Sequence, residues 1–109
     1  AHLEVARERA RKTAIGNVSF HQLRSARDLH GLPSFDLFFS VIVLQHNPPP
    51  VIRLILDRIF AKLEPGGYAF FQVPTYCANY RFVWEEYLAG EGQGMEMHVL
   101  PQKEVFRIL

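Results

Sequence analysis

The feature that most constrains the fold is the apolar run FDLFFSVIVL at residues 35–44. A run of aromatic and β-branched residues that is apolar at nearly every position predicts a strand buried on both faces. Asn47 then offers an oxygen that can cap a helix, and Pro48 suits the first helical position because its missing N–H would have no partner there. We therefore predict a strand followed by a helix that starts near Pro48.

The segment after Pro48 has helical periodicity, and the sequence EPGG at residues 64–67 ends the pattern as a tight helix-to-strand turn. The next segment, YAFFQVP at residues 68–74, predicts a second buried strand. A strand, a helix and a strand in this order predict a parallel pair with a right-handed crossover. The predicted apolar helix face consists of Ile52, Ile55, Leu56, Ile59, Phe60 and Leu63.

The flanking segments predict further elements. A stripe of small and apolar residues in the first seventeen predicts a helix with one buried face, and the alternation in VSFHQL at residues 18–23 predicts a short strand. Residues 79–90 are predicted helical, residues 91–94 form a turn, and an extended piece leads to a last helix near Pro101. The order predicts one α/β domain over residues 1–109, with helices flanking a mostly parallel sheet. The stripe of the first helix consists of Leu3, Ala6, Ala10 and Ala14.

Charge and composition narrow the classes of partner. Twelve basic and eleven acidic residues give a net charge of +1, which is no electrostatic reason to expect nucleic acid or an anionic membrane. Cys77 is the single cysteine, and none of the five histidines lies three or four residues from another, so we expect neither an internal disulfide nor a metal site. No apolar run approaches the roughly 20 residues that span a bilayer, so a cytoplasmic location is expected.

Four blocks in sequence order resemble a known family. NVSFHQLRSARDL, FDLFFSVIVLQH, ILDRIFAKLEPGGYAFFQV and MHVLPQKEVFRIL are together similar to consecutive segments of class I S-adenosylmethionine-dependent methyltransferases. The resemblance covers nearly the whole chain and implies a partial Rossmann-like domain that uses S-adenosylmethionine as cofactor. Another nucleotide-binding α/β domain, such as a dehydrogenase, fits VIVLQH and LEPGG less well.

The family's first two strands and its glycine-rich cofactor loop have no counterpart here. Gly66 and Gly67 precede a strand, whereas a cofactor-cradling loop follows one and opens a helix. The family sheet order 3-2-1-4-5-7-6 implies that residues 18–23 and 35–44 are separated by two missing strands. We therefore expect an incomplete piece of a larger domain, or a sheet completed by another chain or by rearranged pairing.

The resemblance also implies a set of cofactor contacts. Ser25 and Ala26 match positions that contact the adenine through a polar side chain and a backbone N–H, although many relatives have Asp at the first position. Ser40 and Val41 match the strand that passes the methionine part of the cofactor, largely through backbone carbonyls. Gln45 closes this strand and faces the same cleft. For Ser25 the alternative is a loop serine whose hydroxyl bonds to its own backbone.

The candidate catalytic residue is His46, which could orient a substrate or take a proton when a hydroxyl is methylated. The alternative is a structural histidine bonded to backbone at the helix start. Asp28 is predicted as a turn residue, Leu29 as core, and Asp36 as structural because it lies at the far end of its strand. Methyl transfer needs no obligatory acid or base, since positioning can supply much of the catalysis.

Residues after the second predicted strand could line a pocket for an apolar or ring-bearing small molecule. Ordinary packing on the sheet is the alternative for most of them, and Cys77 is either reactive or simply a small loop residue. The candidate lining residues are Tyr76, Tyr80, Trp84 and His98.

Two kinds of function follow. The first is methyl transfer from S-adenosylmethionine to oxygen or nitrogen of an acceptor, by a chain that is part of a larger or completed domain. The alternative is a non-catalytic, methyltransferase-like module that associates with another chain. The Asn-Pro-Pro sequence at residues 47–49 does not match that of amino-group methyltransferases, because Asn47 follows Asp36 by eleven residues and Val41 holds the position that requires Asn.

Overall fold

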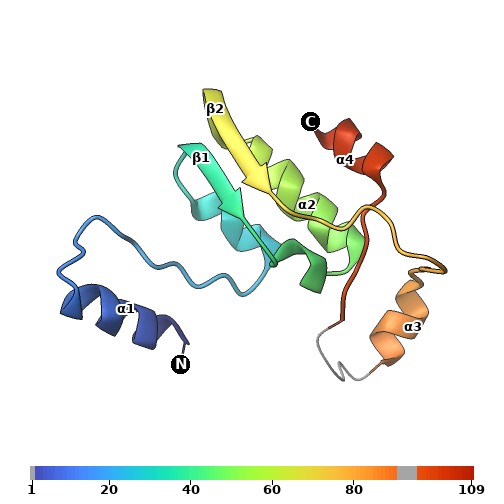
Figure 1. Cartoon of the computed structure of the whole chain (residues 1–109), viewed down its shortest axis with the longest axis horizontal. Helices are drawn as coiled ribbons and strands as arrows, with labels where there is room; N and C mark the ends of the chain where they lie inside the picture. Colours follow the sequence, from blue (N-terminus) through green and yellow to red (C-terminus); the bar gives the residue numbers. More distant parts are fainter. Residues whose placement is uncertain (1, 91–95) are drawn as a thin grey trace.

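A computed structural model of the protein describes residues 2–90 and 96–109, and Figure 1 shows its arrangement. The described elements are α1 (His2–Lys12), the 3-10 helix η1 (Ala26–Gly31), β1 (Phe35–Ser40), the 3-10 turn η2 (Leu44–His46), α2 (Pro49–Phe60), β2 (Leu63–Phe71), α3 (Trp84–Ala89) and α4 (Gln102–Ile108).

The centre of the fold is the unit β1–α2–β2. The two strands pair in parallel, with Phe38 opposite Ala69 and Phe39 opposite Phe70, and α2 makes the crossover between them. Parallel neighbours require such a connection because a hairpin turn cannot join them. The structure therefore confirms a mixed α/β chain with a parallel pair, and the predicted helix after residue 48.

The core lies between α2 and one face of the strands. Ile52 and Leu56 are both fully buried, and they cluster with Leu44 and Leu100. Each side chain of this kind contributes about 1.5–3 kcal/mol when it leaves water completely. Phe38, Phe60 and Phe71 pack against this cluster, so the periodicity of α2 correctly predicted the side of the helix that is buried.

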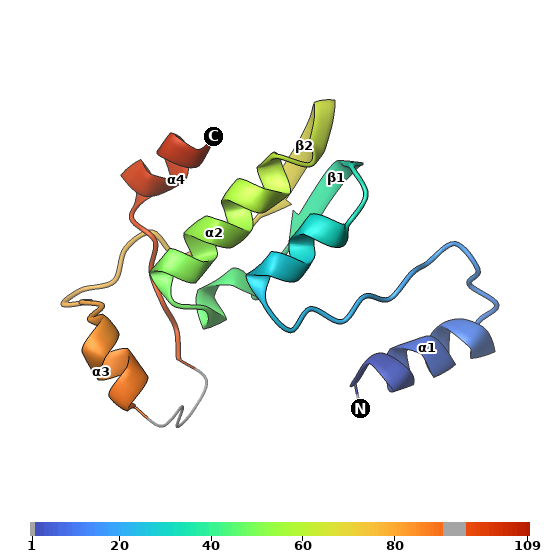
Figure 2. The same cartoon turned by 180° about the vertical axis from the view of Figure 1, so that it is seen from behind.

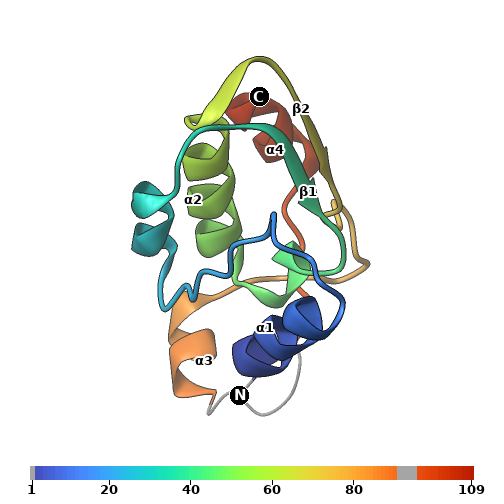
Figure 3. The same ribbon diagram turned by 90° about the vertical axis from the view of Figure 1, so that its left-hand side faces the viewer.

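The prediction of strands buried on both faces is wrong. Leu37 and Phe39 are 58% and 67% exposed, and Tyr68 and Phe70 are 76% and 62% exposed. Figure 1 looks onto this bare face, whereas Figures 2 and 3 show α2 and η1 on the other side of the strands. The side chains alternate between a packed face and an open face, because the described helices cover only one side.

β1 is also shorter than its apolar run. It ends at Ser40, whose carbonyl accepts a hydrogen bond of 2.9 Å from the Gln72 N–H. Ile42 then adopts φ 58°, in the left-handed region that a β-branched residue rarely occupies. The chain therefore leaves the strand direction four residues before the run ends.

β2 begins at Leu63 and includes the EPGG sequence, which was predicted as a turn before the strand. Gly66 has φ +82°, and the register shifts between Phe35 and Leu37 of the facing strand. A Cβ at Gly67 would lie 2.8 Å from the backbone oxygen of Asp36, closer than carbon and oxygen can approach without displacement. The glycines therefore let β2 approach β1 through an irregular stretch of the ladder.

The N-terminal predictions are partly wrong. α1 forms, but none of its residues is buried, and residues 18–23 are extended without strand pairing. An extended segment becomes a strand only when a neighbour accepts its hydrogen bonds. In the described part of the chain, β1 pairs only with β2.

The C-terminal part follows the predicted order with shorter helices. α3 covers only Trp84–Ala89, α4 starts directly after Pro101, and the predicted turn at residues 91–94 lies outside the described residues. The His98 N–H donates to the Gln45 carbonyl at 2.7 Å, and the Leu100 N–H donates to the Pro74 carbonyl at 2.9 Å. These bonds hold the extended segment before α4 against the carboxyl end of the sheet.

Candidate functional site

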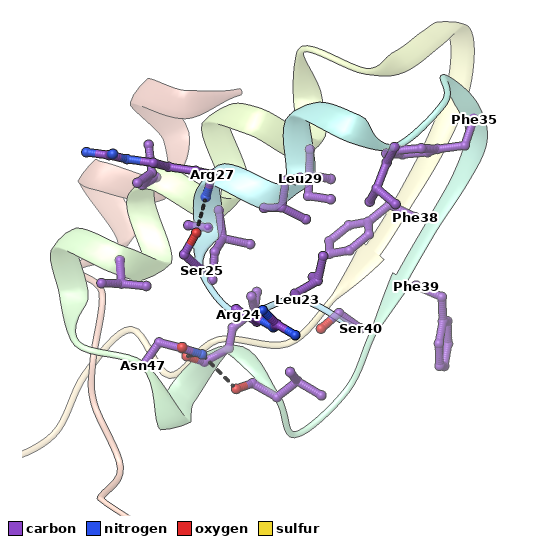
Figure 4. Close-up of a pocket in the computed structure, with 18 of the residues that line it drawn as sticks. Leu23, Arg24, Ser25, Arg27, Leu29, Phe35, Phe38, Phe39, Ser40 and Asn47 are labelled. Atoms are coloured by element: carbon purple, nitrogen blue, oxygen red, sulfur yellow. Dashed lines mark hydrogen bonds between the residues drawn. The ribbon is translucent and has the colours of Figure 1, made fainter. Parts of the chain in front are cut away.

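An open cleft of about 910 Å³ lies between η1 and β1 (Figure 4). Its walls are mainly apolar, and Leu29 and Phe38 point into the space between the two elements. Polar groups enter from residues 24–27 and from the end of β1. The cleft brings together three of the five residues predicted to contact a cofactor, namely Ser25, Ala26 and Ser40.

Ser25 begins η1 and forms a reciprocal cap with Asp28. The Ser25 Oγ accepts from the Arg27 N–H at 3.3 Å, while Asp28 Oδ2 accepts from the Arg24 and Ser25 N–H groups at 2.7 and 3.0 Å. The Arg24 and then the Ser25 backbone N–H lower the pKa of the Asp28 carboxyl, because they stabilise its charged form. Asp28 is thus a turn residue as predicted, and the Ser25 oxygen bonds to local backbone.

The Ser25 oxygen acts as an acceptor in the capping bond, and the Ser25 hydroxyl also hydrogen-bonds the Asp28 carboxyl, which, after the Arg24 and Ser25 backbone N–H groups, helps to lower the pKa of Asp28. Ala26 is the first residue of η1, so its N–H has no partner within the helix. Leu29, predicted as core, is only 4% exposed and supports the floor of the cleft. The start of η1 therefore presents one donor, the Ala26 N–H, and one acceptor position, on the Ser25 oxygen, beside an apolar surface.

Ser40 and Val41 separate at the end of β1. Ser40 is 9% exposed and lines the cleft, whereas Val41 lies on a different surface, beside Phe70 and Phe106 of α4. Val41 does not line the cleft with Ser40, because the chain leaves β1 after Ser40 and turns, with Ile42 in the left-handed region.

Gln45 is the second predicted cofactor residue that does not line the cleft. It is 6% exposed, and its Oε1 has no hydrogen-bond partner among the described residues. η2 turns Gln45 away from the cleft, which contains its neighbour Leu44. Gln45 instead faces the C-terminal segment, where its carbonyl accepts from the His98 N–H.

His46 contacts the same segment, since its Nδ1 lies 3.1 Å from the Glu96 carbonyl oxygen. This is the backbone contact expected of a structural histidine. His46 is not among the residues that line the cleft.

Asn47 caps the turn before α2. Its side-chain amide donates to the Val43 and Leu44 carbonyls, both at 3.3 Å, and Pro48 is the N-cap residue without a side-chain hydrogen bond. The predicted cap is therefore wrong by one residue, because Asn47 ends η2 and Pro49 occupies the first helical position. Asn47 also lines the cleft.

A second pocket, of about 370 Å³, is formed by residues 80–87 and 96–98. The Tyr80 hydroxyl lies 3.0 Å from His98 Nδ1, and His98 Nε2 lies 3.1 Å from Glu96 Oε2. Phe82 and Tyr87 pack edge to face on the His98 ring, with centroids 5.7 Å away in both pairs. Tyr80 and His98 were predicted to line a substrate pocket, and they do share one.

The other two candidates lie outside this second pocket. Tyr76 is 82% exposed, and Trp84 packs against Phe82 and Tyr87 from outside the lining. Cys77 is exposed, and its thiol donates to the Ala78 carbonyl. The structure therefore divides the predicted aromatic group into two pocket residues and two surface residues.

Glu96, Phe82 and Tyr87 were not predicted from the sequence. A signal was present for Glu96, because residues two apart in an extended segment share a face and the sequence reads Glu-Met-His. The positions of Phe82 and Tyr87 depend on how residues 80–87 fold back onto the segment before α4, which no local pattern encodes.

Burial raises the pKa of the Tyr80 phenol above its ordinary value. The backbone N–H of Val99 acts in the opposite direction, and the negative charges of Glu96 and Cys77 add to the increase. The phenol is therefore held in its neutral form, with its proton available to His98.

These features define an α/β chain with an open cleft along β1 and an aromatic pocket beyond the carboxyl ends of the two parallel strands, the region in which such sheets bind ligands. The chain matches no protein-family model, no curated protein and no solved structure. Among the described residues, no helix is long and apolar enough to cross a membrane. The same residues contain no group of three or more His, Cys, Asp or Glu side chains placed to hold a metal ion.

Proposed function

We propose that this chain is part of a Rossmann-like, S-adenosylmethionine-dependent methyltransferase domain and that the cleft between η1 and β1 receives the nucleoside part of the cofactor. The observation that carries the proposal is the convergence of Ser25, Ala26 and Ser40 on one cleft. Ser40 lies 15 positions after Ser25 and 14 after Ala26 along the chain, and the resemblance selected all three independently of the structure.

The chemistry of the cleft fits a purine. A purine ring needs apolar walls, and Leu23, Leu29 and Phe38 provide them. It also needs polar partners along its edge, and the Ala26 N–H can donate to a ring nitrogen while the Ser25 oxygen can accept from the amino group of adenine. Ser40 stands at the strand end, where a polar part of the ligand would lie.

The cofactor would supply an activated methyl group, and this chain would position it. Because Val41 and Gln45 lie outside the cleft, contacts to the methionine part depend on Ser40 alone among the residues predicted for it. The bare face and free edge of β1 support the further proposal that additional strands and helices complete the sheet.

Isothermal titration with S-adenosylhomocysteine tests the proposal. We expect saturable binding, and we expect Ser25→Ala to weaken it by about tenfold, the value of one hydrogen bond. Thr13→Ala is the matched control, because it removes a hydroxyl that bonds only to α1 carbonyls. Absence of binding to wild-type protein, or equal effects of both variants, would contradict the assignment of the cleft.

A second candidate function is association through the bare sheet face. Phe39 and Phe70 stack there with centroids 5.4 Å apart, and both are mostly exposed. Exposed apolar surface of this kind marks interaction sites, and a second copy could pair with the free edge of β1. Sedimentation equilibrium of wild type and Phe39→Lys tests this function, which requires a dimer that the variant dissociates.

A further inference from the structure

The aromatic pocket contains a hydrogen-bonded chain with a defined direction. His98 is 6% exposed, and both of its ring nitrogens have partners. A neutral imidazole that donates from Nε2 to the Glu96 carboxylate must accept at Nδ1. In that tautomer the Tyr80 hydroxyl donates its proton to His98 Nδ1.

This direction leaves the Tyr80 oxygen as an acceptor. A phenol oxygen has two acceptor positions, and the Val99 N–H takes one. The other is available to a donor inside the pocket. Glu96 fixes the His98 tautomer and His98 fixes the Tyr80 proton, so the acceptor at Tyr80 is preorganised.

The charges of the pocket favour a cation. Arg81 and Glu86 both line it, and they neutralise each other through an ion pair of 2.8 Å. Glu96 has no basic partner among the described residues except the ring of His98. The Glu96 carboxyl is half exposed, so a ligand can reach it.

The walls favour the same ligand. Phe82 and Tyr87 line the pocket, and aromatic faces attract ammonium groups through their quadrupole. A volume of about 370 Å³ suits a single-ring or short-chain molecule.

The pocket also adjoins the cleft through η2. Leu44 and Asn47 line the cleft, while the Gln45 carbonyl and the His46 ring contact the segment that carries Glu96 and His98. One short turn therefore separates the two sites.

We propose that the aromatic pocket binds a small organic amine in its ammonium form. Glu96 and the Tyr80 oxygen accept hydrogen bonds from the charged nitrogen, and the rings of Phe82 and Tyr87 contact the rest of the molecule. As a methyl acceptor this amine rests on the proposed function, and it narrows the acceptor from oxygen or nitrogen to nitrogen. The ammonium would first give a proton to the Glu96 carboxylate, so that the freed nitrogen lone pair could attack the methyl carbon while the bond from that carbon to the cofactor sulfur breaks. Binding of the amine itself needs no cofactor.

Trp84 is the single tryptophan of the chain and contacts both aromatic walls, so its fluorescence reports on this pocket. Benzylamine is the probe, and benzyl alcohol is its uncharged isostere. We expect a saturable change with benzylamine and at least tenfold weaker binding of benzyl alcohol.

Glu96→Gln should weaken benzylamine binding by about tenfold, because it removes one charge-assisted partner. Tyr80→Phe should weaken it less and leave the fold intact, which far-ultraviolet circular dichroism checks. Asp57→Asn makes the same charge change on the exposed side of α2 and should have no effect.

Equal binding of the amine and the alcohol, no saturable change, or equal losses in Glu96→Gln and Asp57→Asn would overturn the proposal. The amine titration contains no S-adenosylhomocysteine, so a negative result would count against the amine pocket alone and not against the cofactor cleft. Likewise, failure of S-adenosylhomocysteine to bind would count against the cofactor cleft and not against the amine pocket.

Discussion

Phe38 and Phe39 form a matched pair, because they are the same residue type on adjacent positions of β1 with opposite faces. Phe38 packs against the core cluster and lies 6.2 Å, between centroids, from Phe71. Phe39 is 67% exposed and contacts Phe70 on the bare face. Truncation of each to alanine therefore measures the two faces of the sheet separately.

The expected magnitudes differ. Phe38→Ala should lower the free energy of unfolding by about 3 kcal/mol, the lower end for a core phenylalanine, since the side chain is half-buried. Burial of one third of Phe39 contributes about 0.5–1 kcal/mol, and its stacking on Phe70 adds about 0.5–1 kcal/mol. Phe39→Ala should therefore cost about half as much as Phe38→Ala.

Urea unfolding followed by circular dichroism measures both variants, at two protein concentrations. Equal losses of unfolding free energy in Phe38→Ala and Phe39→Ala, at both protein concentrations, would refute the conclusion that only one face of the sheet is packed. If the difference in unfolding free energy between the wild type and Phe39→Ala is larger at the higher protein concentration, another copy of the chain covers this face in the wild type.

Three further predictions concern single positions. Gly67→Ala should destabilise the fold by about 1–3 kcal/mol, because its Cβ would lie 2.8 Å from a backbone oxygen of β1. Gly31→Ala is the control, since its Cβ would meet no atom within 4 Å and should be tolerated. Thermal unfolding compares the two variants. In the ultraviolet spectrum Tyr80 should titrate above the ordinary 10.0, since burial raises its pKa, and Glu96→Gln should bring that pKa down. The stability that depends on this neutral phenol is present below the unfolded pKa and is lost as pH rises through the folded pKa. The lowered pKa of Asp28 has the opposite effect on stability. Its stabilising contribution is present above the unfolded pKa of about 3.9 and is lost as pH falls through the folded pKa. The urea concentration at the unfolding midpoint should therefore fall less steeply with decreasing pH in Asp28→Asn than in the wild type.

Local patterns predicted the helices better than the strands. The face of α2 and the start of α4 after Pro101 depend on periodicity and on proline chemistry within one segment. The ends of β1 and β2 depend on what pairs beside them, so the apolar run continued past Ser40 although the strand did not. For the same reason, residues 18–23 have strand-like alternation and no strand pairing.

The candidate site was predictable where sequence position fixes the end of an element. Ser25, Ala26 and Ser40 stand at such ends and meet in the cleft. Val41 and Gln45 were assigned to the cleft but do not line it. Beyond Ser40 the chain turns, and a shift of one residue in a turn moves a side chain to another surface. The positions of Phe82 and Tyr87 depend on how residues 80–87 fold back onto the segment before α4, which only the tertiary structure supplies.

The central claim, that the cleft receives a nucleoside cofactor, is tested most directly by amide chemical-shift mapping during titration with S-adenosylhomocysteine. The account predicts saturable shifts concentrated at residues 23–29 and at Ser40, Leu44 and Asn47, with α1 unaffected. Shifts confined to Tyr68 and Phe70 of the bare face, or no shifts at all, would contradict it.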